Sequence, residues 1–187
     1  MDIIAQRFLN KQETRRFMTF SVLVDKSPQG FIDPDILPLL TILNVKFVTT
    51  SSCSGRITLM KGIKKGDAKW IYKTHELADN AAIFAELQKL EGDETLRFLY
   101  EPFIIHLKCK DFAEVSWMLG FLHANGLKKS GMISGKNLVV EINDSGKIEM
   151  LMNNTLSFEY VTLMVNEANR RLLSTKAKIK KMEELFA

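Results

Sequence analysis

The spacing of apolar and polar residues divides the chain into helical and extended segments. In residues 78–90 the apolar side chains recur at helical spacing, and Gly92 ends the segment. Residues 2–20 show the amphipathic pattern of a helix with basic side chains on its outer faces. The predicted helices are residues 2–20, 35–44, 78–90, 111–125 and 158 onward, with Asp33, Asp111 and Ser157 as N-caps.

Short apolar runs between turn-forming residues predict the strands. Residues 57–60 and 69–74 are expected to form a hairpin, and residues 137–142 and 148–152 another. Small residues interrupt the strand expected at 127–136, and glycines inside a strand let a ligand or a second backbone approach closely. The remaining strands are residues 45–48, 95–100 and 103–110.

The order of these elements is neither a regular βαβ alternation nor an all-β pattern. It predicts an α+β fold with a mixed β-sheet flanked by helices, in a single domain over residues 1–187. The chain has no G-x-G-x-x-G after a strand, no G-x-x-x-x-G-K-[ST] and no H-E-x-x-H. A Rossmann fold and a P-loop are therefore not supported.

Composition adds only broad limits. Of 187 residues, 46% are hydrophobic and 26% charged, as in an ordinary globular protein, and the net charge of +4 permits an anionic partner without requiring one. The cysteines, Cys53 and Cys109, are too few and too far apart for a metal framework, so no metal is expected. We expect reduced thiols in a cytoplasmic protein, because no signal peptide and no membrane-length apolar run is found.

A run of hydroxyl side chains stands between the strands expected at 45–48 and 57–60, and is predicted to connect them. Together with the guanidinium of Arg56 and a turn at Gly55, it would offer many hydrogen-bond donors to a phosphate, a carboxylate or a base edge. The alternative is a serine-rich turn whose hydroxyls bond only their own backbone. The hydroxyl side chains are Thr49, Thr50, Ser51, Ser52 and Ser54.

Other polar residues remain after caps and cores are assigned. Asp33 and Asp35 are explained by the helix that starts at Pro34, whereas Asp25 and Ser27 in the same loop are not. Histidines in or beside strands are often satisfied core residues, so His75 and His106 have both a structural and a functional interpretation. A cysteine hydrolase built on Cys53 is a further, weaker alternative.

Several blocks of the sequence together resemble the tRNA wybutosine-synthesizing protein 3 family over nearly the whole chain. The Ser-Ser-Cys-Ser-Gly-Arg and Glu-Pro-Phe-Ile-x-His blocks are the most specific. A short hairpin after Asn137 makes this chain similar to compact, archaeal members. The blocks are Asp25, Ser27, Gly30 and Asp33; Phe47 with Thr49 to Arg56; Trp70, Thr74 and His75; Glu101 to Ile104, His106 and Cys109; Ser130 to Met132; and Glu159-Tyr160 with Ala168-Asn169.

The resemblance implies a methyltransferase that uses S-adenosyl-L-methionine. It would methylate nitrogen-4 of the tricyclic wyosine-type base 3′ of the anticodon in tRNA(Phe), with the anticodon stem-loop as partner and no membrane or metal. The competing class is a non-catalytic RNA-binding module. Methyl transfer needs an in-line approach, a site that excludes water and a nitrogen relieved of its proton.

Roles follow from the resemblance together with the residues left unexplained. Asp25 is the candidate base, with Ser27 beside it and His75 as a second catalytic candidate. Either Trp70 or Tyr72 would stack on the base, although a core role is the commoner one for Trp. Cofactor or substrate would be bound by Ser27, Ser51, Ser52, Ser54, Gly55, Arg56, His106, Ser130 and Gly131, and the tRNA backbone by Lys61, Lys64, Lys65, Lys128, Lys129 and Lys136.

Overall fold

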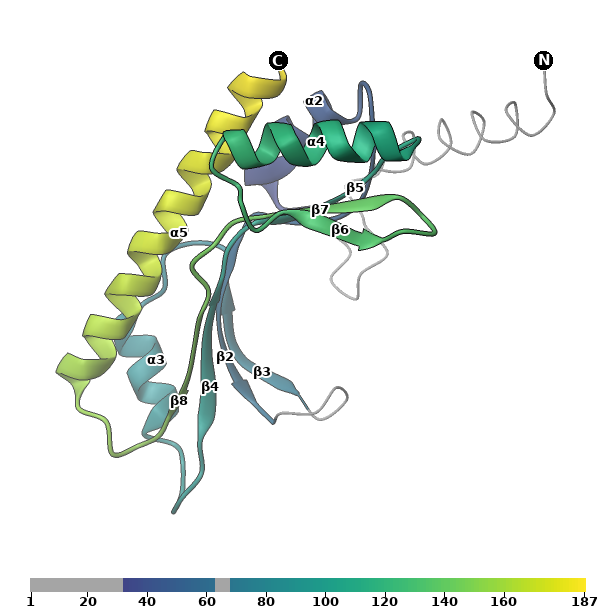
Figure 1. Ribbon diagram of the computed structural model, residues 1–187. Helices are drawn as coiled ribbons and strands as arrows, with labels where there is room; N and C mark the ends of the chain where they lie inside the picture. Colours follow the sequence, from purple (N-terminus) through teal and green to yellow (C-terminus); the bar gives the residue numbers. More distant parts are fainter. Residues whose placement is uncertain (1–31, 63–67) are drawn as a thin grey trace. The chain divides into compact units, whose positions relative to one another are not determined.

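The computed structural model describes residues 32–62 and 68–187. The helix predicted at 2–20, together with Asp25, Ser27, Lys64 and Lys65, lies outside the described residues. The chain divides into two compact units (Figure 1). Unit 1 comprises the described residues up to Cys53 together with Ile104–Asn143 and Ile179–Ala187, and unit 2 comprises Ser54–Phe103 and Asp144–Lys178.

Unit 1 is built on a four-stranded antiparallel sheet in the order β1-β5-β7-β6. Because β1 and β6 are the outer strands, each has one unpaired edge within the sheet. The elements of unit 1 are the 3-10 helix η1 (Pro34–Ile36), α2 (Leu37–Leu43), β1 (Val48–Cys53), β5 (Ile104–Lys108), α4 (Phe112–Ala124), β6 (Gly131–Ser134) and β7 (Val139–Asn143).

Alternation along the two central strands gives this sheet a buried face and an open face. Ile105, Leu107, Val140 and Ile142 are fully buried and share one face of the sheet. In Figure 1, α4 runs along one side of this sheet. The residues that alternate with these four point the other way and remain partly exposed. The open face of unit 1 therefore carries His106, Lys108, Glu141 and Asn143, together with the apolar Ile104 and Val139.

Unit 2 repeats the plan with a second antiparallel sheet, ordered β3-β2-β4-β8. Its apolar side packs against two helices, and the core joins side chains such as Leu59 and Phe98 to Ile83 of α3 and Val165 of α5. The elements are β2 (Arg56–Lys61), β3 (Lys69–Thr74), α3 (Asn80–Leu87), β4 (Leu96–Glu101), β8 (Ile148–Met152) and α5 (Phe158–Phe186), whose last residues, from Ile179, belong to unit 1.

The α+β class is confirmed, and nothing in the described residues indicates a Rossmann fold. The predicted mixed sheet is wrong, because all strand pairs in the described residues are antiparallel and they form two sheets. The caps at Asp111 and Ser157 are confirmed, since their side chains accept hydrogen bonds from the amides of Glu114 and Tyr160. The single domain over 1–187 stays a prediction.

Three local predictions are wrong. The hydroxyl run does not connect two strands: it forms most of β1, and only Ser54 and Gly55 lie between β1 and β2. Polar side chains suit β1 because an edge strand exposes much of its surface to water. The strands β7 and β8 belong to different sheets rather than to one hairpin. Of the strand expected at 127–136, only Gly131–Ser134 is extended.

Two smaller expectations also fail. A helix begins at Pro34, but its first turn is 3-10 and the side chain of Asp33 makes no capping hydrogen bond. Among the described residues, no second backbone approaches Gly131 closely, since a Cβ there would meet no atom within 4 Å, and the approach of a ligand at Gly131 stays a prediction. The helices among the described residues are too short or too polar to cross a membrane.

Candidate active site

Four residues form one row across the open face of unit 1. Ser51 of β1 lies opposite His106 of β5, His106 lies opposite Glu141 of β7, and Glu141 lies opposite Gly131 of β6. Residues directly opposite each other in an antiparallel pair project to the same face. The fold thus brings together three of the predicted site residues, Ser51, His106 and Gly131, and places Glu141, to which the sequence interpretation assigns no role, in the same row.

Glu141 holds two side chains of this face through its two oxygens. Its Oε2 lies 3.0 Å from Nε2 of His106, and its Oε1 accepts a hydrogen bond of 3.1 Å from the amide of Asn143. The side chains of His106 and Glu141 are 27% and 24% exposed, so both are shielded yet reachable. Because an ionised carboxylate only accepts hydrogen bonds, Nε2 of His106 carries the proton, and in the neutral ring Nδ1 is an acceptor.

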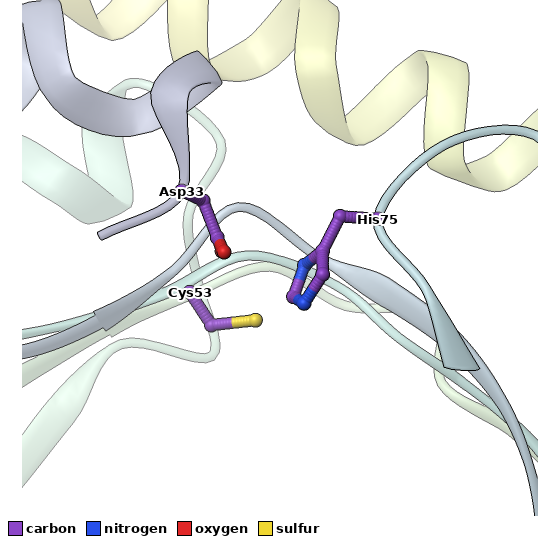
Figure 2. Close-up of side chains that lie close together, drawn as sticks. All are labelled: Asp33, Cys53 and His75. Atoms are coloured by element: carbon purple, nitrogen blue, oxygen red, sulfur yellow. The ribbon is translucent and has the colours of Figure 1, made fainter. Parts of the chain in front are cut away.

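A thiol and a second carboxylate lie farther along β1. Cys53 is two residues from Ser51 and so projects to the same face. The Sγ of Cys53 and a carboxylate oxygen of Asp33, which precedes η1, lie within 4.8 Å of each other. Figure 2 shows these two side chains directed toward one another; His75, drawn with them, belongs to unit 2. Cys53 is half-buried and not enclosed in the core.

Cys109 has a different environment. It is 2% exposed, and burial, assisted by the carboxylates of Glu114 and Asp111, raises the pKa of its thiol to about 11. A thiol with this pKa stays protonated at neutral pH and is a poor nucleophile. We therefore assign Cys109 to the core of unit 1.

The side chains of Ser130 and Ser52 are less exposed than that of Ser51. The hydroxyl of Ser130 is buried and accepts a hydrogen bond of 3.2 Å from the amide of Asn143, while its carbonyl lies 2.9 Å from Nε2 of His123. Ser130 thus fixes the end of β7. Ser52 lies opposite Ile105, on the face that the core covers, and is half-buried.

Unit 2 gathers three of the sequence blocks around Gly55 and Arg56. The Nδ1 of His75 lies 2.9 Å from the carbonyl oxygen of Gly55, so it is the protonated nitrogen that donates. The guanidinium of Arg56 donates to Glu101 over 2.6 Å and lies 5.0 Å from the ring centroid of Trp70. Ser54, which is predicted to bind the cofactor or substrate, is fully buried and already interacts with another group of the protein.

Trp70 carries a second cation, which makes this region of the sheet of unit 2 positively charged. The Nζ of Lys73 lies 4.6 Å from the ring centroid. Such cation–π contacts position the cation without neutralising its charge. Because Glu101 already bonds Arg56, the guanidinium can bind an anion only with its remaining N–H groups.

The predicted lysines differ in how available they are. Lys61 donates to Glu94 over 2.6 Å. Lys128, Lys129 and Lys136 flank β6 and are exposed, and none has an ion-pair partner among the described residues. Of the predicted lysines that the structure describes, these three therefore offer uncompensated charge to a polyanion.

Comparison with known sequences decides the family. Residues 6–187 match the sequence model of the Methyltransferase TYW3 family. The chain belongs to this family. Two relatives support the assignment. The archaeal tRNA(Phe) 7-((3-amino-3-carboxypropyl)-4-demethylwyosine(37)-N(4))-methyltransferase of Thermococcus sibiricus is 31% identical over 87% of each chain. The human tRNA wybutosine-synthesizing protein 3 homolog is 29% identical over 84% of this chain.

The curated relatives are not all of this length. The chain spans 65% of the human relative and 18% of the Arabidopsis thaliana tRNA wybutosine-synthesizing protein 2/3/4, to which it is 32% identical. A solved structure of the PH1069 protein from Pyrococcus horikoshii covers 97% of both chains with a TM-score of 0.83 and 27% identity. A protein of Aeropyrum pernix follows with a TM-score of 0.70, 26% identity and coverage of 82% and 96%.

The sequence interpretation of this TYW3 family chain assigns no role to two acidic residues of the candidate site. Glu101 was noted as part of a block but given no role, and it proves to be the partner of Arg56. Glu141 stands in the strand Val-Val-Glu-Ile-Asn, where alternation alone placed it on the open face. A charged residue in such a position is ordinary, so only the pairing with His106 sets it apart.

Proposed function

We propose that this chain is an S-adenosyl-L-methionine-dependent tRNA methyltransferase of the cytoplasm. It would methylate nitrogen-4 of the tricyclic wyosine-type base that lies 3′ of the anticodon in tRNA(Phe). The observation that carries the proposal is membership of the Methyltransferase TYW3 family over residues 6–187. The activity in the name of the archaeal relative, which matches this chain over most of its length, supports the substrate.

The chemistry of the open face of unit 1 fits such a methyl donor. The donor's amino group and ribose hydroxyls need acceptors, and Glu141 and Asp33 present carboxylates there. Its carboxylate and adenine need hydrogen-bond donors, which Ser51 and the backbone of the edge strand β1 can supply. When bound, S-adenosyl-L-methionine supplies a methyl group on a positively charged sulfur.

The chain's own residues must orient the base, exclude water and accept the proton of the ring nitrogen. Asp25 and His75 remain candidates for accepting the proton. His75 donates from Nδ1 to Gly55, so in its neutral form Nε2 is the nitrogen that accepts. The binding of cofactor or substrate predicted for Ser27, Ser52, Ser54, Gly55, Arg56 and Ser130 remains part of the proposal.

The tRNA backbone would be bound by the exposed lysines of unit 1 and the cations of unit 2. Lys128, Lys129 and Lys136 carry no compensating partner among the described residues, whereas the charge of Lys61 is shared with Glu94. Trp70 holds Arg56 and Lys73 beside its ring, so it serves better as a support for these cations than as a free stacking surface.

A methyl-transfer assay tests the proposal. Purified protein, S-adenosyl-L-methionine with a labelled methyl group, and tRNA(Phe) bearing the demethylated tricyclic base should give one labelled methyl per tRNA, located by mass spectrometry at that nucleoside. The same tRNA with an unmodified guanosine is the matched control and should stay unlabelled. Calorimetry completes the test, because a non-catalytic RNA-binding module would bind tRNA and release no heat with the cofactor.

A further inference from the structure

We propose that His106 accepts the proton of the reacting ring nitrogen and that Glu141 is the positioning residue that prepares it to do so. The inference rests on the proposed function and names its general base. It differs from the sequence interpretation, in which His106 only bound a ligand and Glu141 had no role.

The tautomer of His106 is set by a carboxylate. Oε2 of Glu141 lies 3.0 Å from Nε2, and that contact requires the hydrogen to be on Nε2. The second oxygen of Glu141 accepts from Asn143, which prevents the carboxylate from rotating away. Nδ1 of the neutral ring is then the basic atom, and no described residue forms a hydrogen bond with it.

The carboxylate partner distinguishes His106 from His123. Nε2 of His123 lies 2.9 Å from the backbone carbonyl oxygen of Ser130, whereas Nε2 of His106 lies 3.0 Å from a carboxylate oxygen. A carbonyl orients the ring, but a carboxylate also stabilises the positive charge that the ring acquires when it takes a proton. The contact with Glu141 therefore suits His106 to act as a base.

The row that contains the pair leaves room for a flat base. On one side of Glu141 is Gly131, where an added Cβ would meet no atom within 4 Å, and on the other side of His106 is Ser51, which is small and exposed. Ile105, Leu107, Val140 and Ile142 point to the opposite, buried face. The neighbours of His106 on its own face of β5 are Ile104 and Lys108, so a planar ring would approach His106 along the row, over Ser51 and Gly131, and not along β5.

Among the described residues, few other ionisable groups share this face. Lys108 lies two residues along β5, and β7 contributes Glu141 and the neutral Asn143. Cys53 projects from β1, and a carboxylate oxygen of Asp33 lies within 4.8 Å of its sulfur. The carboxylate of Glu141 is thus the charged group in direct contact with the imidazole.

The step balances without a further reactant. The N–H bond of the ring nitrogen breaks and its proton moves to Nδ1 of His106, while the nitrogen electron pair forms the new bond to the methyl carbon. The bond between that carbon and the donor's sulfur breaks, and its electron pair stays on sulfur as a neutral thioether. Glu141 remains ionised throughout, next to the imidazolium, which later returns the proton to water.

Kinetics of four variants test both roles. His106→Gln should lower kcat by about 10²–10⁴-fold, the usual contribution of a positioned base, with the Kd values for S-adenosyl-L-methionine and tRNA within about threefold of wild type. Glu141→Gln should lower kcat by at least about 10-fold, and Glu141→Asp should recover part of the loss. Glu167→Gln, which removes the negative charge from two partly exposed ion pairs on α5, is the matched control and should not change kcat.

A second measurement does not depend on turnover or on the folding of a variant. ¹⁵N NMR of the wild-type protein should show the neutral ring of His106 with its proton on Nε2. A proton on Nδ1, or unchanged kcat in both Glu141→Gln and His106→Gln, overturns the inference. If the wild-type protein transfers no methyl, the proposed function fails with it, whereas an active wild type with unaffected variants refutes this inference alone.

Discussion

Gly55 and Thr175 are packed so closely that a Cβ at residue 55 would lie 2.9 Å from Cγ2 of the threonine. The same atom would lie 3.3 Å from the carbonyl oxygen of Glu101, and Gly55 has φ of +99°, a conformation that other residues rarely adopt. We therefore predict that Gly55→Ala destabilises the protein by about 2–4 kcal/mol, combining backbone strain with overpacking. Denaturant unfolding followed by circular dichroism would measure the loss.

Gly92→Ala separates the two contributions. Gly92 also has a positive φ, of +53°, but a Cβ there meets nothing within 4 Å, so only strain of about 1–2 kcal/mol should appear. Thr175→Ser removes the methyl group that the new Cβ would strike, and combined with Gly55→Ala it should recover part of the loss. Equal losses at the two glycines would show that packing against Thr175 contributes nothing.

Asp144 is a buried carboxylate that joins α5 to the chain before β8. It is 6% exposed, and its oxygens accept hydrogen bonds from Lys178 over 2.6 Å and Thr175 over 3.3 Å. Asp144→Ala should cost about 1–3 kcal/mol, because the buried hydroxyl of Thr175 loses its acceptor. Lys178→Met keeps the aliphatic stem but leaves the buried carboxylate of Asp144 without its cation, so it should cost at least as much. Thermal unfolding of the two variants compares them directly.

The helices and several strands could be predicted because their patterns are local. The strand at Lys69–Thr74 was predicted with its observed bounds, and the caps at Asp111 and Ser157 depend on residues within one helical turn. The assignment of β7 and β8 to different sheets is not a local property. It depends on which distant strands they pair with, and a hairpin pattern between them contains no information about those partners.

The candidate site was predicted in parts and not as an arrangement. Ser51, His106 and Gly131 were chosen one by one, and only the register of four strands places them in one row with Glu141. The hydroxyl run was misassigned because serine and threonine suit turns as well as exposed edge strands. Sequence alone therefore gave candidates without the partners that determine their chemistry.

Glu149 makes stability depend on pH in the acidic range. Hydrogen bonds from Lys147 and Arg97 lower the pKa of its carboxyl from 4.5 to about 2. A lowered pKa in the folded state stabilises the protein above pH 4.5, and this contribution is lost as the pH falls toward 2. The effect should not exceed about 1 kcal/mol, since the side chain is 41% exposed.

Glu149→Gln is the variant that isolates this contribution. The difference in unfolding free energy between wild type and variant should be constant near neutral pH and shrink from pH 4.5 to 2. Because salt screens exposed pairs, 1 M sodium chloride should reduce the difference at every pH. A difference that grows on acidification would contradict the assignment.

The two cysteines should react differently with an alkylating reagent. Iodoacetamide at pH 8 should modify the half-buried Cys53 and leave Cys109, which is 2% exposed with a thiol pKa of about 11. Peptide mass spectrometry reads the sites, and both should react in denaturant. Cys53→Ser should retain methyl transfer, since sulfur has no obligatory part in it. Loss of all activity in that variant would favour a cysteine-dependent reaction.

Binding of tRNA should weaken steeply with salt, and the exposed lysines of unit 1 should account for part of the slope. Each lysine–phosphate contact contributes about 0.7–0.9 to the slope of log K against log salt concentration. Replacing Lys128 and Lys129 together by Ala should lower the slope by about 1–2, because neither side chain has a compensating partner among the described residues. Lys61→Ala is the comparison. It removes one positive charge where the double variant removes two, and it takes away the ion-pair partner of Glu94. Filter binding at several salt concentrations gives the slopes, and an unchanged slope in the double variant would place the tRNA on another surface.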